Sequence, residues 1–205
     1  MIKRIVFDID GTLITNVNFQ QSITNSLKKY GVEDYSKTKQ FLLNIKEYEK
    51  IYNCYDKNLY LNFFSEKLNT KLDDKFLQIL FCELRNLIPQ NSSKIKRLLL
   101  ELKEYELVLL SNYFEESQRN RLENMGINEY FSEYYGEEII KPNKEVYIQA
   151  AGKCKPNECI IIGDDKYLDI DMPKKLGFNT IYVNEMGDIN NIEQLNLNMI
   201  KKYTK

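Results

Sequence analysis

The sequence predicts an α/β fold in which a parallel, Rossmann-like sheet lies between two layers of helices and carries an inserted helical cap. Three observations lead to this prediction. Short apolar runs alternate with amphipathic stretches, as they do in βαβ units. The first run, residues 2–9, is apolar on both faces, as strands of a buried parallel sheet are. Between residues 15 and 90 this alternation gives way to helical periodicity alone.

The segment 15–90 is expected to form four helices with no strand among them. Asp56 and Asp73 stand where helix N-caps are expected, and Gly31 stands where a helix ends. Pro89 closes the block. We therefore expect two domains. They are a Rossmann-like catalytic core of residues 1–14 and 91–205, and a helical cap domain of residues 15–90.

After Pro89 the alternation of helices and strands resumes. Strands are expected at residues 107–110, 159–162 and 180–183. Helices are expected after a cap at Ser93, from about 116 to 125, after Pro142, and before Gly177. Parallel strands joined by helices in this way form a sheet that is covered on both faces. The polar, asparagine-rich last twenty residues carry no clear pattern.

Composition excludes several classes of function. The formal net charge is −1, and basic and acidic residues are interspersed, so neither a nucleic-acid nor a membrane partner is expected. No apolar stretch reaches the roughly 18 residues that a membrane span needs. The four cysteines form no CxxC pair, and Asp8 interrupts the first apolar run. We expect a cytoplasmic monomer or homodimer with reduced thiols that acts on a small molecule.

Histidine is absent from the chain. Ser-His and Cys-His mechanisms and imidazole metal sites are therefore excluded. Any catalysis must rely on carboxylates, hydroxyls, amides and lysine.

Three pairs of polar residues each follow one of the predicted strands: Asp8 and Asp10, Ser111 and Asn112, and Asp164 and Asp165. In an open parallel sheet, ligands bind beyond the carboxyl ends of the strands. We therefore expect these side chains to meet at one edge of the sheet. A single polar strand end would mean little, but three in this arrangement indicate a site.

These residue types suit a phosphate monoester and Mg²⁺. Asp8 and Asp164 can supply the oxygen ligands that Mg²⁺ prefers, and no softer ligand nearby favours zinc. The turn at Gly11 lets the carboxylates of Asp8 and Asp10 diverge around one phosphate. One carboxylate could then attack phosphorus, while the other protonates the leaving oxygen and later activates water.

Further polar groups complete this predicted site. Thr12 and Ser111 offer hydroxyls, and Asn112 an amide, for binding the phosphate or the substrate. Lys141, just before Pro142, is the candidate for holding the phosphate oxygens and screening the nucleophile.

The residues resemble the four motifs of the haloacid dehalogenase superfamily, on its phosphatase side. The first motif, DxDG[TV], is similar to residues 8–12, and the second, a Ser or Thr after a strand, to Ser111. The third motif, a Lys commonly followed by Pro, is similar to Lys141 with Pro142, and the fourth, GDxxxxD, to residues 163–169. The helical insertion between the first and second motifs resembles the family's cap.

The resemblance implies a Mg²⁺-dependent phosphatase that hydrolyses a small phosphate monoester, of the sugar phosphate or nucleotide type, through an aspartyl-phosphate intermediate. It implies that Asp8 is the nucleophile and Asp10 the general acid/base. It assigns phosphate binding to Ser111 and Lys141, metal binding to Asp8, Asp164 and the backbone carbonyl of Asp10, and a supporting place to Asp169. Asp165, where the family often has a small hydroxyl residue, adds a negative charge beside the metal.

Other functions stay open. A phosphomutase of the β-phosphoglucomutase kind keeps all four motifs and differs only in its product. A non-catalytic binding module is less favoured, because clustered like charges are costly to keep. A dehalogenase is disfavoured by Asp10, because a haloacid has no leaving oxygen to protonate.

The cap carries a stripe of tyrosines at helical spacing: Tyr48, Tyr52, Tyr55 and Tyr60. We interpret this stripe as core packing, with stacking on a base or sugar as the alternative.

Overall fold

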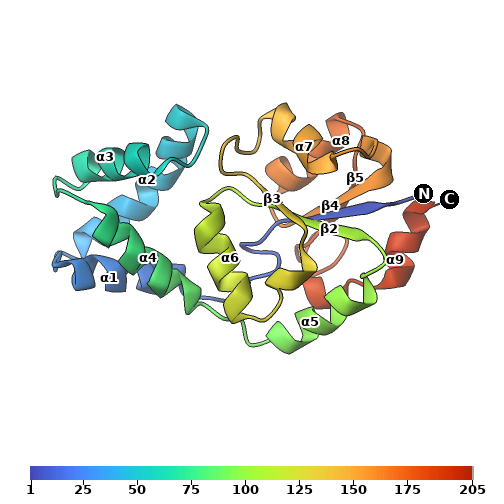
Figure 1. The fold of residues 1–205 in the computed structure, drawn as a ribbon, viewed down its shortest axis with the longest axis horizontal. Coiled ribbons are helices and arrows are strands. Elements are labelled where there is room, and N and C mark those ends of the chain that lie inside the picture. The colour runs from blue at the N-terminus through green and yellow to red at the C-terminus, as the bar shows by residue number, and fades with distance from the viewer. Residues whose placement is uncertain (205) are drawn as a thin grey trace.

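The core of the protein is a five-stranded sheet, which the computed structural model describes together with the rest of residues 1–204 (Figure 1). All strands are parallel, in the order β3-β2-β1-β4-β5. The strands are β1 (Arg4–Phe7), β2 (Glu106–Leu110), β3 (Glu133–Tyr135), β4 (Cys159–Gly163) and β5 (Asn179–Tyr182). Because the chain builds outward through β2 and β3 and then returns to place β4 beside β1, the strand order reverses between β1 and β4. Ligands of such sheets bind at this switch point.

Helices cover both faces of the sheet, as predicted. Side chains alternate along β1, so Ile5 and Phe7 face one layer and Val6 faces the other. The first layer contains α5 (Ser92–Glu101), α6 (Glu115–Asn124) and α9 (Leu197–Lys201), and the second contains α7 (Lys144–Ala151) and α8 (Met172–Lys175) (Figure 1). The sheet is therefore the middle of three layers.

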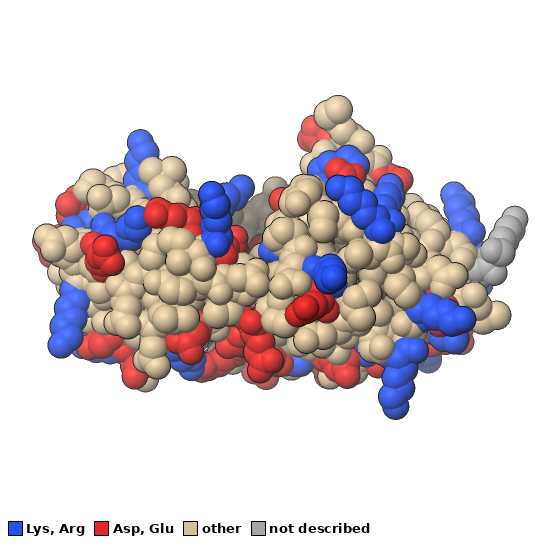
Figure 2. Space-filling view, turned by 90° about the horizontal axis from the view of Figure 1, so that it is seen from above, with Lys and Arg blue, Asp and Glu red and all other residues tan. Residues whose placement is uncertain are grey.

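Four helices lie between β1 and α5 and pack around an apolar cluster of their own (Figure 1). They are α1 (Phe19–Tyr30), α2 (Ser36–Tyr52), α3 (Lys57–Lys67) and α4 (Asp74–Arg85). The predicted helix ends are confirmed: the side chains of Asp56 and Asp73 cap α3 and α4, and Gly31 ends α1 at a positive φ of 100°. Figure 2 shows this cap and the core as two lobes, with basic and acidic side chains interspersed over the face in view.

Aromatic side chains join the cap to the core. Tyr113 and Phe114, which follow β2, enter the apolar cluster of the cap. The ring of Phe114 lies edge-on to Tyr55 and Tyr60, with centroids 5.3 and 5.2 Å apart, and is tilted against Phe81 at 5.4 Å. The cap is therefore packed on the core directly beside the carboxyl end of β2.

The tyrosine stripe forms part of the cap core, which confirms the packing interpretation for most of its members. Tyr48, Tyr55 and Tyr60 are buried within the cluster, and Tyr52 packs against it. Tyr55 also borders a large cavity.

Several elements differ from the prediction. β3 was not expected, because its three half-exposed residues are too few to show a strand pattern. Ser93 is not a helix cap: α5 begins at Ser92, after Asn91. The helix expected before Gly177 is split into a π-helix, η3 (Lys166–Asp171), and the short α8. The remaining short helices are η1 (Asn128–Tyr130), η2 (Pro156–Glu158), η4 (Ile192–Gln194) and η5 (Lys202–Thr204).

Within residues 1–204, none of the helices is both long and apolar enough to cross a membrane.

The aromatic contact between cap and core predicts a large effect on stability. Phe114→Ala removes a fully buried ring, so the free energy of unfolding should fall by about 3–5 kcal/mol. Leu43→Ala on α2, where the side chain is 69% exposed, is the matched control and should change it by less than about 0.5 kcal/mol. Urea denaturation measures both, and equal losses would contradict the proposed packing role.

Candidate active site

Three carboxylates converge where the strand order reverses. Asp8 follows β1 and Asp164 follows β4, and the backbone N–H of Asp8 donates to the carbonyl of Ile162 over 2.9 Å. Asp169, in the π-helix η3, brings the third carboxylate. One oxygen from each of Asp8, Asp164 and Asp169 lies within 4.8 Å of the other two. These carboxylates line a cavity of about 210 Å³ at the edge of the sheet.

Lys141 lies inside this acidic cluster. Its Nζ donates to Oδ1 of Asp8 over 2.8 Å and to Oδ1 of Asp169 over 2.7 Å. The lysine side chain is only 4% exposed. Asn112 positions it: the amide of Asn112 donates to the carbonyl of Lys141 over 3.0 Å and accepts from its N–H over 2.8 Å. Lys141 therefore reaches Asp8, the nucleophile candidate.

Three carboxyl groups share one ammonium in this cluster. Burial raises the pKa of Asp8 to about 8, the ammonium of Lys141 opposes this rise, and Asp169 adds to it. Burial, followed by Asp169, raises the pKa of Asp164 to about 6. For Lys141, burial lowers the pKa, but Asp169 and Asp8 outweigh it and hold the pKa above the usual range. The lysine is thus charged, and the raised pKa values of Asp8 and Asp164 show that a single ammonium does not offset three ionised carboxylates.

This arrangement fits a divalent metal ion. The cluster offers only oxygen ligands, which Mg²⁺ prefers, and its excess negative charge is lowered by a bound cation. Asp8 and Asp164 are free to bind it, because Lys141 takes only one oxygen of Asp8, and Asp164 accepts only a 3.3 Å hydrogen bond from Thr12. Asp169 is more engaged, since its second oxygen accepts from the N–H of Asp165.

Gly11 makes the approach of two strand ends possible. Its φ is +84°, and a Cβ atom there would lie 2.1 Å from Oδ2 of Asp164. A side chain at this position would therefore push the loop after β1 away from Asp164. Thr12, predicted to bind phosphate, is fully buried and donates to Asp164 instead.

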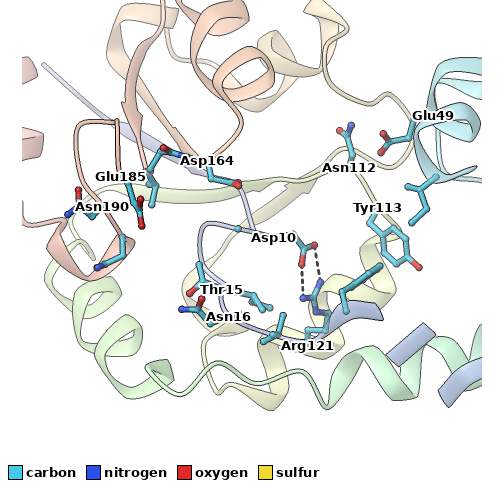
Figure 3. Close-up of a pocket in the computed structure, with 18 of the residues that line it drawn as sticks. Asp10, Thr15, Asn16, Glu49, Asn112, Tyr113, Arg121, Asp164, Glu185 and Asn190 are labelled. Atoms are coloured by element: carbon cyan, nitrogen blue, oxygen red, sulfur yellow. Dashed lines mark hydrogen bonds and ion pairs between the residues drawn. The ribbon is translucent and has the colours of Figure 1, made fainter. Parts of the chain in front are cut away.

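The carboxylate of Asp10 points away from Asp164 and toward Arg121 of α6 (Figure 3). Its oxygens accept from Nη2 of Arg121 over 2.7 Å and from Nη1 over 3.0 Å. Gln118 donates to Oδ2 of Asp10 over 2.8 Å. Burial would raise the pKa of Asp10, but the Arg121 guanidinium outweighs it and holds that pKa below its usual value. Asp10 is therefore ionised and fixed in place.

The predicted site residues do not include Gln118 and Arg121. Both lie on α6, three positions apart, and both are buried. Their spacing on one face of a predicted helix, next to Ser111, is the signal that could have found them.

Two other predicted residues have local partners. Ser111 is buried at the end of β2, with its Oγ 3.4 Å from Nε2 of Gln118. Asp165 caps η3: its Oδ1 accepts from the N–H groups of Tyr167 and Leu168, each over 2.8 Å. Asp165, the residue that departs from the family pattern, thus uses one carboxylate oxygen to cap a helix.

A second cavity, of about 820 Å³, adjoins this cluster and separates cap from core (Figure 3). Asp10 and Asp164 lie on its core side. Glu49 of α2 and Tyr55 line its cap side, and Glu185, after β5, lines another wall. The cavity is large enough to hold the organic part of a substrate. Tyr55 belongs to the tyrosine stripe for which substrate stacking was the alternative interpretation, whereas the sequence pattern did not indicate Glu49.

The contact between Asp10 and Arg121 predicts a measurable pKa change. Arg121→Gln removes the charge that lowers the pKa of Asp10, so this pKa should rise. In the wild type, the ion pair stabilises the folded state at neutral pH, and this stabilisation is lost as the pH falls through the lowered pKa of Asp10. The stability of the variant should therefore not show this loss at acid pH. Carboxyl ¹³C NMR titration measures the pKa directly. Arg119→Gln, on the same helix and paired with Glu115, is the control. An unchanged titration of Asp10 in Arg121→Gln would contradict the assignment.

Comparisons with known proteins agree with this geometry. Residues 2–177 match the family model of the haloacid dehalogenase-like hydrolases. A search of curated proteins gave no match. Solved structures with the same fold include L-2-haloacid dehalogenase from Xanthobacter autotrophicus (TM-score 0.67, 19% identity, covering 91% of this chain and 79% of that one). They also include a HAD phosphatase from Thermococcus onnurineus (TM-score 0.63, 21% identity, 98% of both chains).

A third similar structure is a mutant HAD-family enzyme from Bacteroides thetaiotaomicron in complex with magnesium and inorganic phosphate (TM-score 0.61, 19% identity, 91% of this chain and 96% of that one). At these identities the likeness shows the fold alone. The family match spans most of the chain and includes all four motifs. The protein is therefore an enzyme of the haloacid dehalogenase-like hydrolase family.

Proposed function

We propose that this hydrolase is a Mg²⁺-dependent phosphatase that acts on a small phosphate monoester through an aspartyl-phosphate at Asp8. The observation that carries the proposal is Asp10. It is a second carboxylate, two residues after the nucleophile candidate, and it lines both the small acidic cavity and the large one. A phosphate ester has a leaving oxygen that needs a proton at this place.

The remaining residues suit the two halves of this reaction. Lys141 would hold the phosphate oxygens while keeping Asp8 oriented for attack on phosphorus. Asp10 is ionised in its pair with Arg121, which is the form that activates water to hydrolyse the aspartyl-phosphate. The bound phosphate dianion adds negative charge beside Asp10 and so favours its protonated form, which the departing alkoxide needs.

Metal binding is proposed for the carboxylates of Asp8 and Asp164 and the backbone carbonyl of Asp10. When bound, Mg²⁺ screens the charge between phosphate and carboxylates and orients the phosphoryl group. Asp169 accepts a hydrogen bond from Lys141 and so helps to hold the lysine beside Asp8. Thr12 orients Asp164.

Haloacid dehalogenation is the main rival, because enzymes with this activity share the fold. A haloacid carries a carboxylate, which needs a cation in the substrate cavity. Among the described residues that line the large cavity, Arg121 is the one lysine or arginine, and both its terminal nitrogens already bind Asp10. The phosphatase proposal therefore has better support. A phosphomutase would use the same residues and would yield an isomerised phosphate ester instead of inorganic phosphate.

Residues 15–90 are proposed to be the domain that closes the site and selects the substrate. They contribute Glu49 and Tyr55 to the cavity wall opposite Asp10. Closure of such a domain excludes water and strengthens electrostatic interactions with the phosphoryl group.

Metal dependence tests the proposal directly. The purified protein should release inorganic phosphate from p-nitrophenyl phosphate in Mg²⁺, because the cation offsets the charge of Asp8 and Asp164. Removal of the metal with a chelator should abolish this release, and Mg²⁺ should restore it. Full activity in metal-free buffer, or the absence of any phosphate release with Mg²⁺ over a panel of phosphate esters, would refute the proposal.

The two aspartates of the first motif should differ in effect. Asp8→Asn should abolish the acid-stable phosphoenzyme that rapid quenching traps, because a neutral amide replaces the nucleophilic carboxylate. Asp10→Asn should lower kcat by about 10²–10⁴-fold, as expected for loss of general acid–base catalysis, and should still form the phosphoenzyme with an aryl ester.

Asp171→Asn is the matched control for both variants. Asp171 is exposed and paired with Lys166, and neither cavity includes it. Its substitution should leave turnover within about twofold, as is usual for surface changes away from a site. A trappable phosphoenzyme in Asp8→Asn would show that another residue is the nucleophile.

A further inference from the structure

Glu49 of the cap lies where the two cavities meet. It lines the small cavity together with Asp8 and Lys141, and it also lines the large one. Figure 3 shows its carboxylate directed from α2 toward the side chain of Asn112, across the gap between cap and core. A substrate with its phosphate at Asp8 would therefore place the first atoms of its alcohol part beside Glu49.

Glu49 is held in this position by Tyr55. The hydroxyl of Tyr55 donates to Oε1 of Glu49 over 2.9 Å, and its backbone N–H donates to the carbonyl of Glu137 over 2.7 Å. Tyr55 is 4% exposed. Burial holds the pKa of Glu49 above its usual value, although the hydrogen bonds from Tyr55 and Asn112 and the charge of Lys141 act in the opposite direction. The carboxylate is thus partly desolvated, fixed, and paired with no lysine or arginine among the described residues.

The surroundings of Glu49 are acidic. Asp10, Asp164 and Glu185 also line the large cavity, and its one described cation, Arg121, is bound to Asp10. A divalent metal and Lys141 would together balance the three clustered carboxylates, those of Asp8, Asp164 and Asp169, in formal charge. A phosphate dianion then leaves net negative charge next to Glu49, so a second anionic group on the substrate would meet repulsion.

We propose that Glu49 selects phosphate esters whose alcohol part carries an amine close to the phosphate, and that the acidic cavity rejects esters with a second anionic group. This inference rests on one part of the proposed phosphatase function, namely that the phosphate of the ester binds at Asp8. An ammonium fits because it donates to the carboxylate of Glu49 and neutralises its charge in a partly buried place.

Three phosphonates of matched length test the inference without turnover. They are 2-aminoethylphosphonate, propylphosphonate and 3-phosphonopropionate, which end in an ammonium, a methyl group and a carboxylate. Titration calorimetry with the Mg²⁺-loaded protein gives each Kd. The wild type should bind the ammonium compound about tenfold or more tightly than the carboxylate compound, with the neutral one between them.

Two variants distinguish the effect of the Glu49 charge from that of other acidic residues. Glu49→Gln keeps an oxygen for the Tyr55 hydroxyl but removes the charge, so the affinity ratio of amine to acid should fall at least about fivefold. Glu47→Gln lies on the same helix, where Glu47 is exposed and paired with Lys67 over 2.8 Å. This control should keep the wild-type ratio.

The outcomes are distinct from those of the phosphatase test. Selective binding of the amine, lost in Glu49→Gln, supports the inference even if no ester is hydrolysed. An unchanged ratio in Glu49→Gln, equal affinities in the wild type, or no binding of the amine would overturn it, even if aryl phosphates are hydrolysed rapidly.

Discussion

The buried contact of Lys141 with Asp8 and Asp169 is the interaction on which the rest of the site depends. Three carboxylates within 4.8 Å repel one another strongly in a place with little water. The ammonium of Lys141 lies 2.8 Å from an oxygen of Asp8 and 2.7 Å from an oxygen of Asp169. It reduces the repulsion between the carboxylates but does not neutralise all three. Loss of one member of a buried ion pair costs about 3–5 kcal/mol, because the other charge stays buried. A divalent cation bound here would favour the ionised form of all three carboxylates.

The separation of Asp10 from this cluster follows from a second buried cation. Asp8 and Asp10 are two residues apart, yet Lys141 binds the first and Arg121 binds the second. Gly11 between them permits the turn. Asp8 and Asp10 therefore differ in environment: burial raises the pKa of Asp8, and Arg121 holds that of Asp10 below its usual value. Nucleophilic attack would need Asp8 in its ionised form, which a bound cation favours, and protonation of a leaving oxygen would need Asp10 in its protonated form, which a nearby phosphate dianion favours.

Much of the fold could be predicted from the sequence, because long apolar runs and helix caps are local signals. The strands that end at Asp8, Ser111 and Asp164 carry such signals, and so do the helices of the cap. The edge strand β3 is too short to show such a signal, and the cap at Asp165 indicates that a helix begins there but not that its winding is π-helical. The same holds for the site. The strand ends could be predicted from the sequence, and they indicate which residues meet at the edge of the sheet. The contacts of Thr12 and Asn112 could not be predicted, because they depend on tertiary packing.

The cap and the core share one continuous set of contacts around Tyr55. Its ring packs on Phe114, its hydroxyl fixes Glu49, and its backbone N–H binds the carbonyl of Glu137 in the segment that leads to Lys141. A movement of the cap that separates Tyr55 from the core would therefore withdraw Glu49 from the substrate cavity and release the loop before Lys141 together. The proposed substrate recognition by the cap and the proposed phosphate binding by the core would in this way be connected, because both depend on the position of the buried Tyr55 side chain.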